Sequence, residues 1–280
     1  MKDHEEKIAH LLDSVFAKYG NSYLDTDPVG LVHRFSSEED IEVVGFFAAL
    51  LAFGNVLQIK RSIEALLEIL GPHPAGFVKN FTFRKKSALD GFRHRFVGGE
   101  QVATLILSLR KVIAQRGSIK NAFVDDYAPG DMVGSLSRFI RNLRRAAGGR
   151  GDLLKFLLPD PERGSACKRL FLYLRWMVRR DDGVDFGIFD SVSPGDLVIP
   201  LDTHVARLSG LFGFTRKKIR NLSMALEITE FLRRFDPHDP VKYDFALTRI
   251  GIVEGCRGVF SVSRCRDCQA WEVCRALPAQ

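Results

Sequence analysis

The spacing of apolar residues along the chain predicts a mainly α-helical protein. Apolar positions recur every three or four residues in several stretches, and this period places them on one face of a helix. The stretches are residues 39–54, 57–71, 99–117, 132–149, 165–180, 222–235 and 241–252. The first, EDIEVVGFFAALLAFG, is apolar almost all round, which is typical of a buried central helix. No sustained alternation of apolar and polar residues indicates a sheet.

The segments between the predicted helices favour turns because they are rich in Gly, Pro and Asp. Ser165 stands where the N-cap of the helix over 165–180 is expected. The stretch 181–198, DDGVDFGIFDSVSPGDLV, is polar and irregular, and it leads into the motif IPLDTHVARL at 199–208. We therefore expect helices joined by short loops, with one longer irregular connection.

The composition is that of a folded protein. The chain has 280 residues, 46% of them hydrophobic and 22 of them Phe, which suits one large domain or two closely packed lobes. No apolar run reaches the length of a bilayer-spanning helix, because charges interrupt each candidate. The first residues, MKDHEEKIAHLL, lack the apolar core of a secretory signal. These features lead us to expect a cytoplasmic protein.

The charge balance points to a polyanionic partner. The formal net charge is +7 and the pI is about 9.2. Basic residues gather in five clusters, at Arg84–Lys86, Arg93–Arg95, Arg141–Arg150, Arg175–Arg180 and Arg216–Arg220. Any one cluster is typical of a solvated helix face, whereas the five together indicate a nucleic-acid surface.

Four of the five cysteines lie close together near the C-terminus. Cys256, Cys265, Cys268 and Cys274 follow the spacing C-x8-C-x2-C-x5-C. Four thiolates can bind either a tetrahedral zinc ion or a [4Fe–4S] cluster. Only one pair is close in sequence, while structural zinc sites more often use two such pairs. Four unrelated buried thiols are the third interpretation, and a metal site is favoured because so dense a cluster is rare by chance.

Lys168 lies in the first turn of a predicted helix. The preceding stretch LLPDPERGSAC forms a Pro- and Gly-containing turn, whose backbone N–H groups can bind a phosphate. The helix dipole disfavours an ammonium ion at this position by only about 0.3–1 kcal/mol. A nucleophilic amine would therefore also need partial burial. Taken alone, an ordinary exposed lysine is the favoured interpretation.

The motif IPLDTHVARL predicts a helix whose N-cap is Asp202 or Thr203. Val205, Leu208 and Leu211 follow at helical spacing. A capping carboxylate accepts backbone N–H bonds at the positive end of the helix dipole, which stabilises its negative charge. Such a charge is also what an oxocarbenium-like transition state requires. The two roles are compatible, although the cap alone is favoured when this motif is considered by itself.

The order of these three features along the chain resembles that of a known protein family. A turn and helix with a lysine, then PLDTHVARL, then a C-terminal cysteine cluster resemble the helix-hairpin-helix (HhH-GPD) DNA glycosylase superfamily of the endonuclease III type. The family segment is close to V-D-T-H-V-x-R, and residues 227–256 look like the helices that lead to its first cluster cysteine. The resemblance is strong over about 200–274, moderate over 155–180 and architectural before that. The chain looks most like a bacterial branch with an atypical hairpin.

This resemblance implies a two-lobed, all-helical DNA glycosylase fold with a helix-hairpin-helix element and a C-terminal iron–sulfur cluster loop. The central lobe would span 41–195 and end in the hairpin and the Lys168 helix. The second lobe would be discontinuous and comprise 1–40 plus 196–280, with Asp202 and the cysteines. A monomer associated with the bacterial nucleoid is expected.

The resemblance also implies a base-excision-repair reaction on double-stranded DNA with a flipped, damaged base. The base would be an oxidised one. Lys168 matches the lysine that attacks the sugar and forms a Schiff base, so AP lyase activity would follow, and Asp202 matches the catalytic aspartate. The four cysteines match the ligands of the [4Fe–4S] cluster, with zinc as the alternative.

Further residues are expected to contact the DNA. In this superfamily a loop after the buried central helix inserts a polar side chain into the gap left by the flipped base. Asn55 is the candidate and Gln58 the alternative, while a C-cap role for Asn55 is equally compatible with the sequence. The remaining candidates are Gly164, Ser165 and Arg169 at the hairpin, and Arg257 and Arg264 in the cysteine loop.

Two other functions stay open at this point. The chain could be a non-catalytic DNA-binding module of the same fold. It could also be an enzyme that acts on RNA or tRNA through the same basic surface. The sequence does not single out the excised base, because pocket residues come from helices far apart in the chain.

Overall fold

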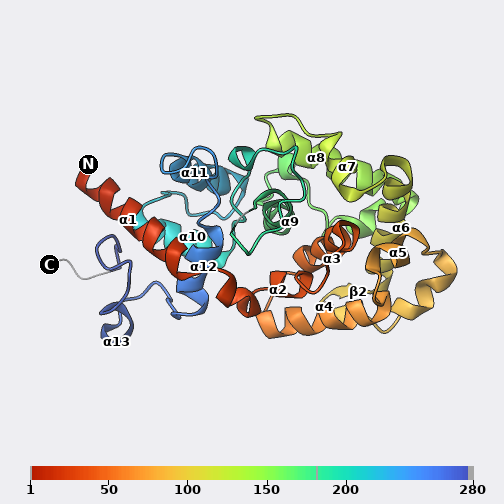
Figure 1. Cartoon of the computed structure of the whole chain (residues 1–280), viewed down its shortest axis with the longest axis horizontal. Coiled ribbons are helices and arrows are strands. Elements are labelled where there is room, and N and C mark those ends of the chain that lie inside the picture. The colour runs from red at the N-terminus through yellow and green to blue at the C-terminus, as the bar shows by residue number, and fades with distance from the viewer. Residues whose placement is uncertain (1, 181, 277–280) are drawn as a thin grey trace.

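The computed structural model describes residues 2–180 and 182–276, and this part of the chain is mainly helical (Figure 1). The longer helices are α1 (Lys2–Lys18), α3 (Glu38–Leu50), α4 (Val56–Leu70), α6 (Gly99–Arg116), α8 (Met132–Ala146), α9 (Lys168–Val178), α10 (Thr203–Phe212), α11 (Leu222–Arg233) and α12 (Asp244–Ile252). The shorter ones are α2 (Val29–Val32), α5 (Pro74–Lys79), α7 (Ile119–Val124) and α13 (Val262–Cys265). The predicted all-α character is therefore confirmed.

Short 3-10 helices and one small hairpin complete the described secondary structure. The 3-10 helices are η1 (Asn21–Thr26), η2 (Phe83–Leu89), η3 (Gly148–Leu154), η4 (Pro161–Arg163) and η5 (Pro194–Asp196). The strands β1 (Arg93–His94) and β2 (Val97–Gly98) pair antiparallel, which the periodicity did not predict because each has two residues. Asp181, the first residue of the predicted irregular segment, lies outside the described residues, as do residues 1 and 277–280 of the expected second lobe.

The helix with Lys168 begins later than the sequence predicts. Its N-cap is Cys167, and the Ser165 cap is wrong. Gly164 and Cys167 both adopt the left-handed conformation, with φ of 83° and 43°, so the chain turns twice before helical bonding begins. The Ser165 hydroxyl oxygen instead accepts the N–H of Cys167 at 3.3 Å within this turn. The turn makes Lys168 the first residue of α9.

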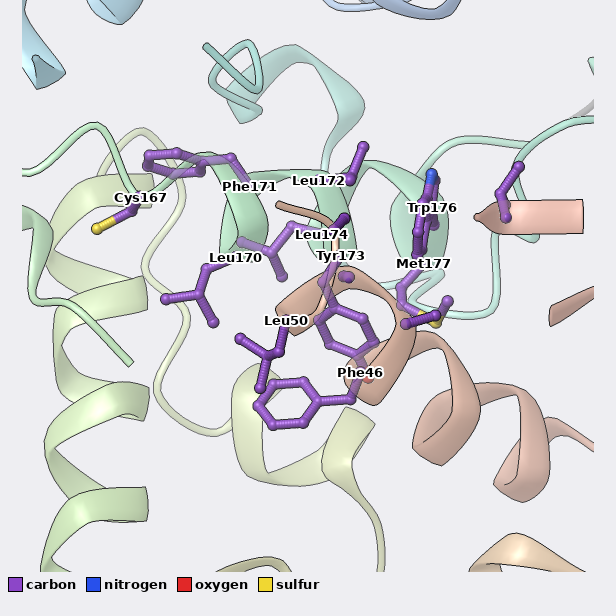
Figure 2. Close-up of a cluster of buried hydrophobic side chains, with 14 of the residues drawn as sticks. Phe46, Leu50, Cys167, Leu170, Phe171, Leu172, Tyr173, Leu174, Trp176 and Met177 are labelled. Atoms are coloured by element: carbon purple, nitrogen blue, oxygen red, sulfur yellow. The ribbon is translucent and has the colours of Figure 1, made fainter. Parts of the chain in front are cut away.

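Helix α9 is the central element of the core (Figure 2). It packs against α3, and the rings of Phe46 and Tyr173 meet edge to face at 5.0 Å. Phe171, Tyr173 and Trp176 are buried. Each large apolar side chain buried in this way contributes about 1.5–3 kcal/mol. The packing therefore fixes α9, and with it Lys168, relative to the end of α3.

The first long helix lies against the last one. In Figure 1, α1 lies beside α12, whereas α3 to α8 gather on the other side of α9. Helix α10 packs against α12, so the segment after residue 200 faces the central helix from the side opposite α3. The lobe limits at residues 40 and 195 stay a prediction. None of the helices in the described part of the chain is long and apolar enough to cross a membrane.

Candidate functional site

An open cavity of about 1010 Å³ brings together residues that are far apart in the sequence. Lys168, Asp202 and Asn55 all line it. Its walls come from the turn before α2, the end of α3 with the start of α4, the β1–β2 hairpin, the segment between η3 and η4, one side of α9, the α10 and α12 pair, and the segment before α11. A cavity of this volume can hold a nucleotide-sized ligand.

Asp202 is the N-cap of α10, and Thr203 is its first residue. The Asp202 Oδ1 atom accepts the N–H of Val205 at 2.7 Å. Its side chain is half-buried, and its other carboxylate oxygen has no hydrogen-bond partner among the described residues. One oxygen therefore fixes the helix start, and the second remains available to a ligand in the cavity.

Lys168 presents an amine without a counter-ion. Its Nζ atom donates to the carbonyl of Ala52, just after α3, at 3.4 Å, and within the described residues it forms no ion pair. Its charge acts on the Asp244 carboxyl, whose pKa it lowers in opposition to the larger effect of burial. Lys168 and Asp202 therefore share the cavity without neutralising each other by direct contact.

His204 and Arg207 connect the start of α10 to the cysteine segment. An Arg207 Nη2 atom lies 3.0 Å from His204 Nδ1 and donates to the carbonyl of Cys256 at 2.7 Å. Burial lowers the pKa of His204, although Asp202 opposes that shift. Gly251 makes room for this ring, since a Cβ there would lie 2.1 Å from His204 Nδ1. The helix that carries Asp202 is therefore held directly against the first cysteine.

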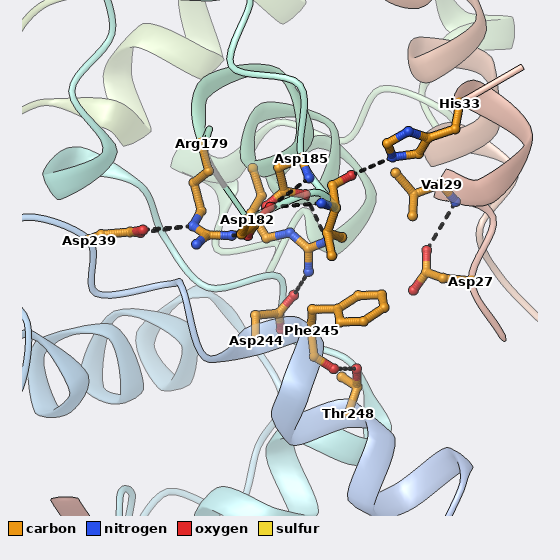
Figure 3. Close-up of polar contacts among 12 residues, drawn as sticks. Asp27, Val29, His33, Arg179, Asp182, Asp185, Asp239, Asp244, Phe245 and Thr248 are labelled. Atoms are coloured by element: carbon orange, nitrogen blue, oxygen red, sulfur yellow. Dashed lines mark hydrogen bonds and ion pairs between the residues drawn. The ribbon is translucent and has the colours of Figure 1, made fainter. Parts of the chain in front are cut away.

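Buried ion pairs lie behind the cavity (Figure 3). Arg175 contacts Asp185 at 3.1 Å and Asp244 at 2.5 Å. Arg179 contacts Asp185 at 2.5 Å and Asp239 at 2.9 Å. The basic cluster Arg175–Arg180 is therefore not a solvated helix face or a nucleic-acid surface as predicted. Its first two arginines are buried because aspartates from the following loop and from the α12 region compensate their charge.

Asp244, from this network, and Arg249 both line the cavity. Asp244, the first residue of α12, is buried, and burial raises its pKa to about 6 even though Arg175 opposes the shift. Arg249, five residues further along α12, pairs with Asp27 at 3.0 Å. Burial raises the pKa of Asp27, but Arg249 and other cations outweigh it, and the net shift is downward. The polar wall of the cavity thus alternates negative and positive groups.

An aromatic cluster, Phe53, Phe96 and Phe156, forms the apolar wall. Neighbouring rings lie 4.4–5.4 Å apart, and Phe96 and Phe156 remain 55% and 43% exposed. The Arg169 guanidinium packs on Phe53 and Phe156 and donates to the carbonyls of Leu50 and Phe156. Burial lowers the pKa of Arg169 to about 10. The hydrogen bonds of Arg169 are thus directed into the protein.

Of the residues expected to contact DNA, Asn55 lines the cavity as Arg169 does, and the others do not. Asn55 lines it, and as the N-cap of α4 it accepts the N–H of Leu57 at 2.9 Å, so the C-cap alternative is wrong. Gln58 is exposed on α4 and does not line the cavity. Gly164 and Ser165 lie in the turn before α9. Arg257 and Arg264 are exposed in the cysteine segment, away from the cavity wall.

The four C-terminal cysteines surround one small apolar pocket. Cys256, Cys265, Cys268 and Cys274 line this hollow of about 30 Å³ together with Phe212 and Trp271, among others. Burial raises the pKa of Cys268 and of Cys274, and the neighbouring thiols add to both shifts. Within residues 2–180 and 182–276 no cysteine forms a disulfide, and no three His, Cys, Asp or Glu side chains are grouped to hold one metal ion. Thiols are nevertheless the type of donor that zinc ions and iron–sulfur clusters bind.

Sequence reasoning missed four charged residues of the cavity wall: Asp27, Arg175, Asp244 and Arg249. Three of them interrupt apolar helical stretches, in FLYLRWMV and YDFALTRIGI. A charge on the buried face of a helix needs a partner, so these interruptions were the available signal. The partners themselves come from distant segments and could not be identified from one sequence.

The family model described as "Protein of unknown function (DUF2400)" matches residues 27–253 of the chain. No curated protein and no solved structure matches it. The matched range contains Asp27, Lys168, Asp202 and Asp244, and it ends before the first cluster cysteine.

Proposed function

We propose that this chain, which belongs to the DUF2400 family of proteins of unknown function, is a DNA glycosylase with Schiff-base AP lyase activity. Its substrate would be double-stranded DNA from which a damaged, oxidised base has been flipped out. The proposal rests on one observation above others: Lys168 and Asp202, 34 positions apart in the sequence, line the same cavity.

The two residues would divide the chemistry between them. The Lys168 amine would attack the sugar C1′ as the bond to the base breaks, forming a Schiff base from which β-elimination cleaves the strand. Positive charge develops on the sugar during this step, and the Asp202 carboxylate would stabilise it electrostatically. The cap bond to Val205 supports this role because it holds the carboxylate in place before the substrate binds.

The surroundings of the cavity support a nucleic-acid substrate. Arg95 and Arg220 line the same cavity as the aromatic cluster, which combines phosphate-binding charges with rings on which bases can stack. The N–H groups of Ser165 and Ala166, just before Lys168, have no acceptor among the described residues. Such donors in the turn before a helix can bind a DNA phosphate.

The cysteine segment would hold a [4Fe–4S] cluster through Cys256, Cys265, Cys268 and Cys274. When bound, such a cluster supplies a cross-link between the segments that carry the four cysteines. Arg207 would transmit that constraint, since it joins the Cys256 carbonyl to the helix that begins after Asp202. Zinc at the same thiolates is the alternative.

Purified protein is expected to contain iron and to absorb visible light. Cys268→Ser should remove most of both, because Ser is a poor ligand for iron in such clusters and Cys268 lies in the pocket with the other three cysteines. Cys167→Ser is the matched control, since Cys167 is a buried thiol outside this pocket. Metal analysis and absorbance of freshly purified protein measure the effect. A colourless protein with one zinc per chain would contradict the iron–sulfur assignment.

The proposed function is tested by a glycosylase screen on duplex oligonucleotides. Each duplex carries an oxidised purine, an oxidised pyrimidine, a deaminated base or an abasic site, and strand cleavage is measured with and without alkaline treatment. We expect cleavage of at least one oxidised-base duplex and of the abasic duplex. Unlabelled duplex DNA should compete for the reaction far better than RNA of the same sequence. Cleavage of none of them, or stronger competition by RNA, would count against the proposal.

A further inference from the structure

The Asp244 carboxyl group lies between the cavity and the buried ion pairs of α9. Its Oδ2 atom accepts from Arg175 Nη1 at 2.5 Å, while its Oδ1 atom is buried without a hydrogen-bond partner. Only 4% of the side chain is exposed, and the residue lines the cavity. Buried polar atoms almost always have a partner. Pairing with Arg175 accounts for the burial of the Asp244 Oδ2 atom but not for that of the Oδ1 atom, which has no hydrogen-bond partner.

Charged groups of both signs surround the Asp244 carboxyl group. Arg175 and Lys168 on α9 favour the carboxylate, whereas Asp202 at the start of α10 disfavours it. The other titratable groups of the cavity wall are Asp27, Arg95, Arg169, His204, Arg220 and Arg249, and Asp185 pairs with Arg175 behind it. Burial outweighs the cations and raises the pKa of Asp244 to about 6. About a tenth of the group is therefore protonated at pH 7, and about half at pH 6.

Asp202 and Asp244 thus have different environments in one cavity. Asp202 accepts a backbone N–H at a helix N-terminus, where negative charge is stabilised. Asp244 is enclosed and has one oxygen without a donor. Paired carboxyl groups in unlike environments commonly divide into an anion and an acid.

Resting on the glycosylase function proposed above, we propose that Asp244 is the catalytic acid that protonates the departing base. In this step the bond between C1′ and the base nitrogen breaks and its electron pair goes to the base. The base takes the proton from the Asp244 carboxyl, while Lys168 Nζ, as the neutral amine left after its own proton has passed to solvent, forms its bond to C1′. Asp244 is left as a carboxylate paired with Arg175, and it regains a proton from solvent after product release.

The experiment compares two substrates that differ in one step. A duplex with an oxidised base requires protonation of the leaving base, whereas the same duplex with an abasic site does not. Asp244→Asn should slow base removal by about 10²–10⁴-fold, the usual contribution of a general acid. Its borohydride-trapped adduct with the abasic duplex should form at the wild-type rate. Asp239→Asn is the matched control, because Asp239 pairs with Arg179 in the same network but does not line the cavity.

The pH dependence of base removal by the wild-type protein gives a second test, which holds even if the variant does not fold. Only protonated Asp244 can donate, so base removal should fall as the pH rises through about 6. Adduct formation on the abasic duplex should lack this decline. In Asp244→Asn the decline should also be missing from base removal, since no titrating donor remains.

The possible outcomes separate this inference from the function on which it rests. If Asp244→Asn weakens both reactions equally, the residue serves only to pair with Arg175 and the inference is overturned. Unchanged base removal, or a wild-type rate that does not decline above pH 6, overturns it as well. If the wild-type protein neither removes a base nor forms an adduct, the glycosylase function itself fails. An adduct on the abasic duplex without removal of any base would support the lyase activity and contradict the role of Asp244 as the acid.

Discussion

Replacing Lys168 by Gln is expected to abolish the covalent adduct that borohydride traps between the protein and an abasic duplex. Borohydride reduction of an imine leaves a stable covalent bond between protein and DNA, and the imine requires the primary amine that Gln lacks. Lys168 makes one hydrogen bond, of 3.4 Å, and no ion pair among the described residues. Its removal should therefore cost less than about 1 kcal/mol of stability. The fold should remain while the adduct is lost.

The matched control for this experiment is Lys155→Gln. Lys155 is 57% exposed, pairs only with Asp152 among the described residues, and does not line the cavity. Its adduct should form at the wild-type rate, measured by denaturing electrophoresis of the trapped complex. An adduct that persists in Lys168→Gln would place the nucleophile elsewhere. If the wild-type protein forms none either, the lyase assignment fails, and a monofunctional reaction with Asp202 and water remains.

The helices were predicted well because their apolar residues repeat with the helical period. The stretch 99–117 becomes α6, Gly99–Arg116, and the central apolar stretch becomes α3. Boundaries were less accurate where the backbone turns before the helix. At α9 two left-handed residues displace the start from Ser165 to Lys168, and no propensity rule indicated a left-handed Cys167. Local pattern therefore determines which segments are helical, and turn geometry determines where they begin.

The candidate site was predictable only in part. The order of the lysine turn, the DTH motif and the cysteines indicated residues that the structure brings into one cavity or one pocket. Asp244 and Arg175 were missed because their importance depends on a contact between α9 and α12, 69 positions apart. Arg175 was even assigned to a basic surface cluster. A single sequence shows where a charged residue stands, but it does not show which distant residue balances its charge.

Asp202→Asn is expected to reduce base removal by about 10³-fold while the protein stays folded. Asn is as good an N-cap as Asp, so the bond to the Val205 N–H should persist. What is lost is the negative charge beside the sugar. At about 4 Å and an effective dielectric constant of about 20, that interaction is worth about 4 kcal/mol, which corresponds to about 10³-fold in rate. Because this charge acts mainly on the transition state, DNA affinity should change little.

The control for Asp202→Asn is another helix cap, Asp131→Asn. Asp131 caps α8 through the Gly134 N–H at 2.9 Å and does not line the cavity, so the same substitution there should leave turnover unchanged. Single-turnover rates on the oxidised-base duplex, with thermal midpoints for both variants, measure the difference. A loss of turnover in Asp202→Asn with an unchanged midpoint separates the catalytic charge from the cap. If turnover is retained, Asp202 serves only to begin α10, and the charge that assists base removal must come from another residue of this cavity.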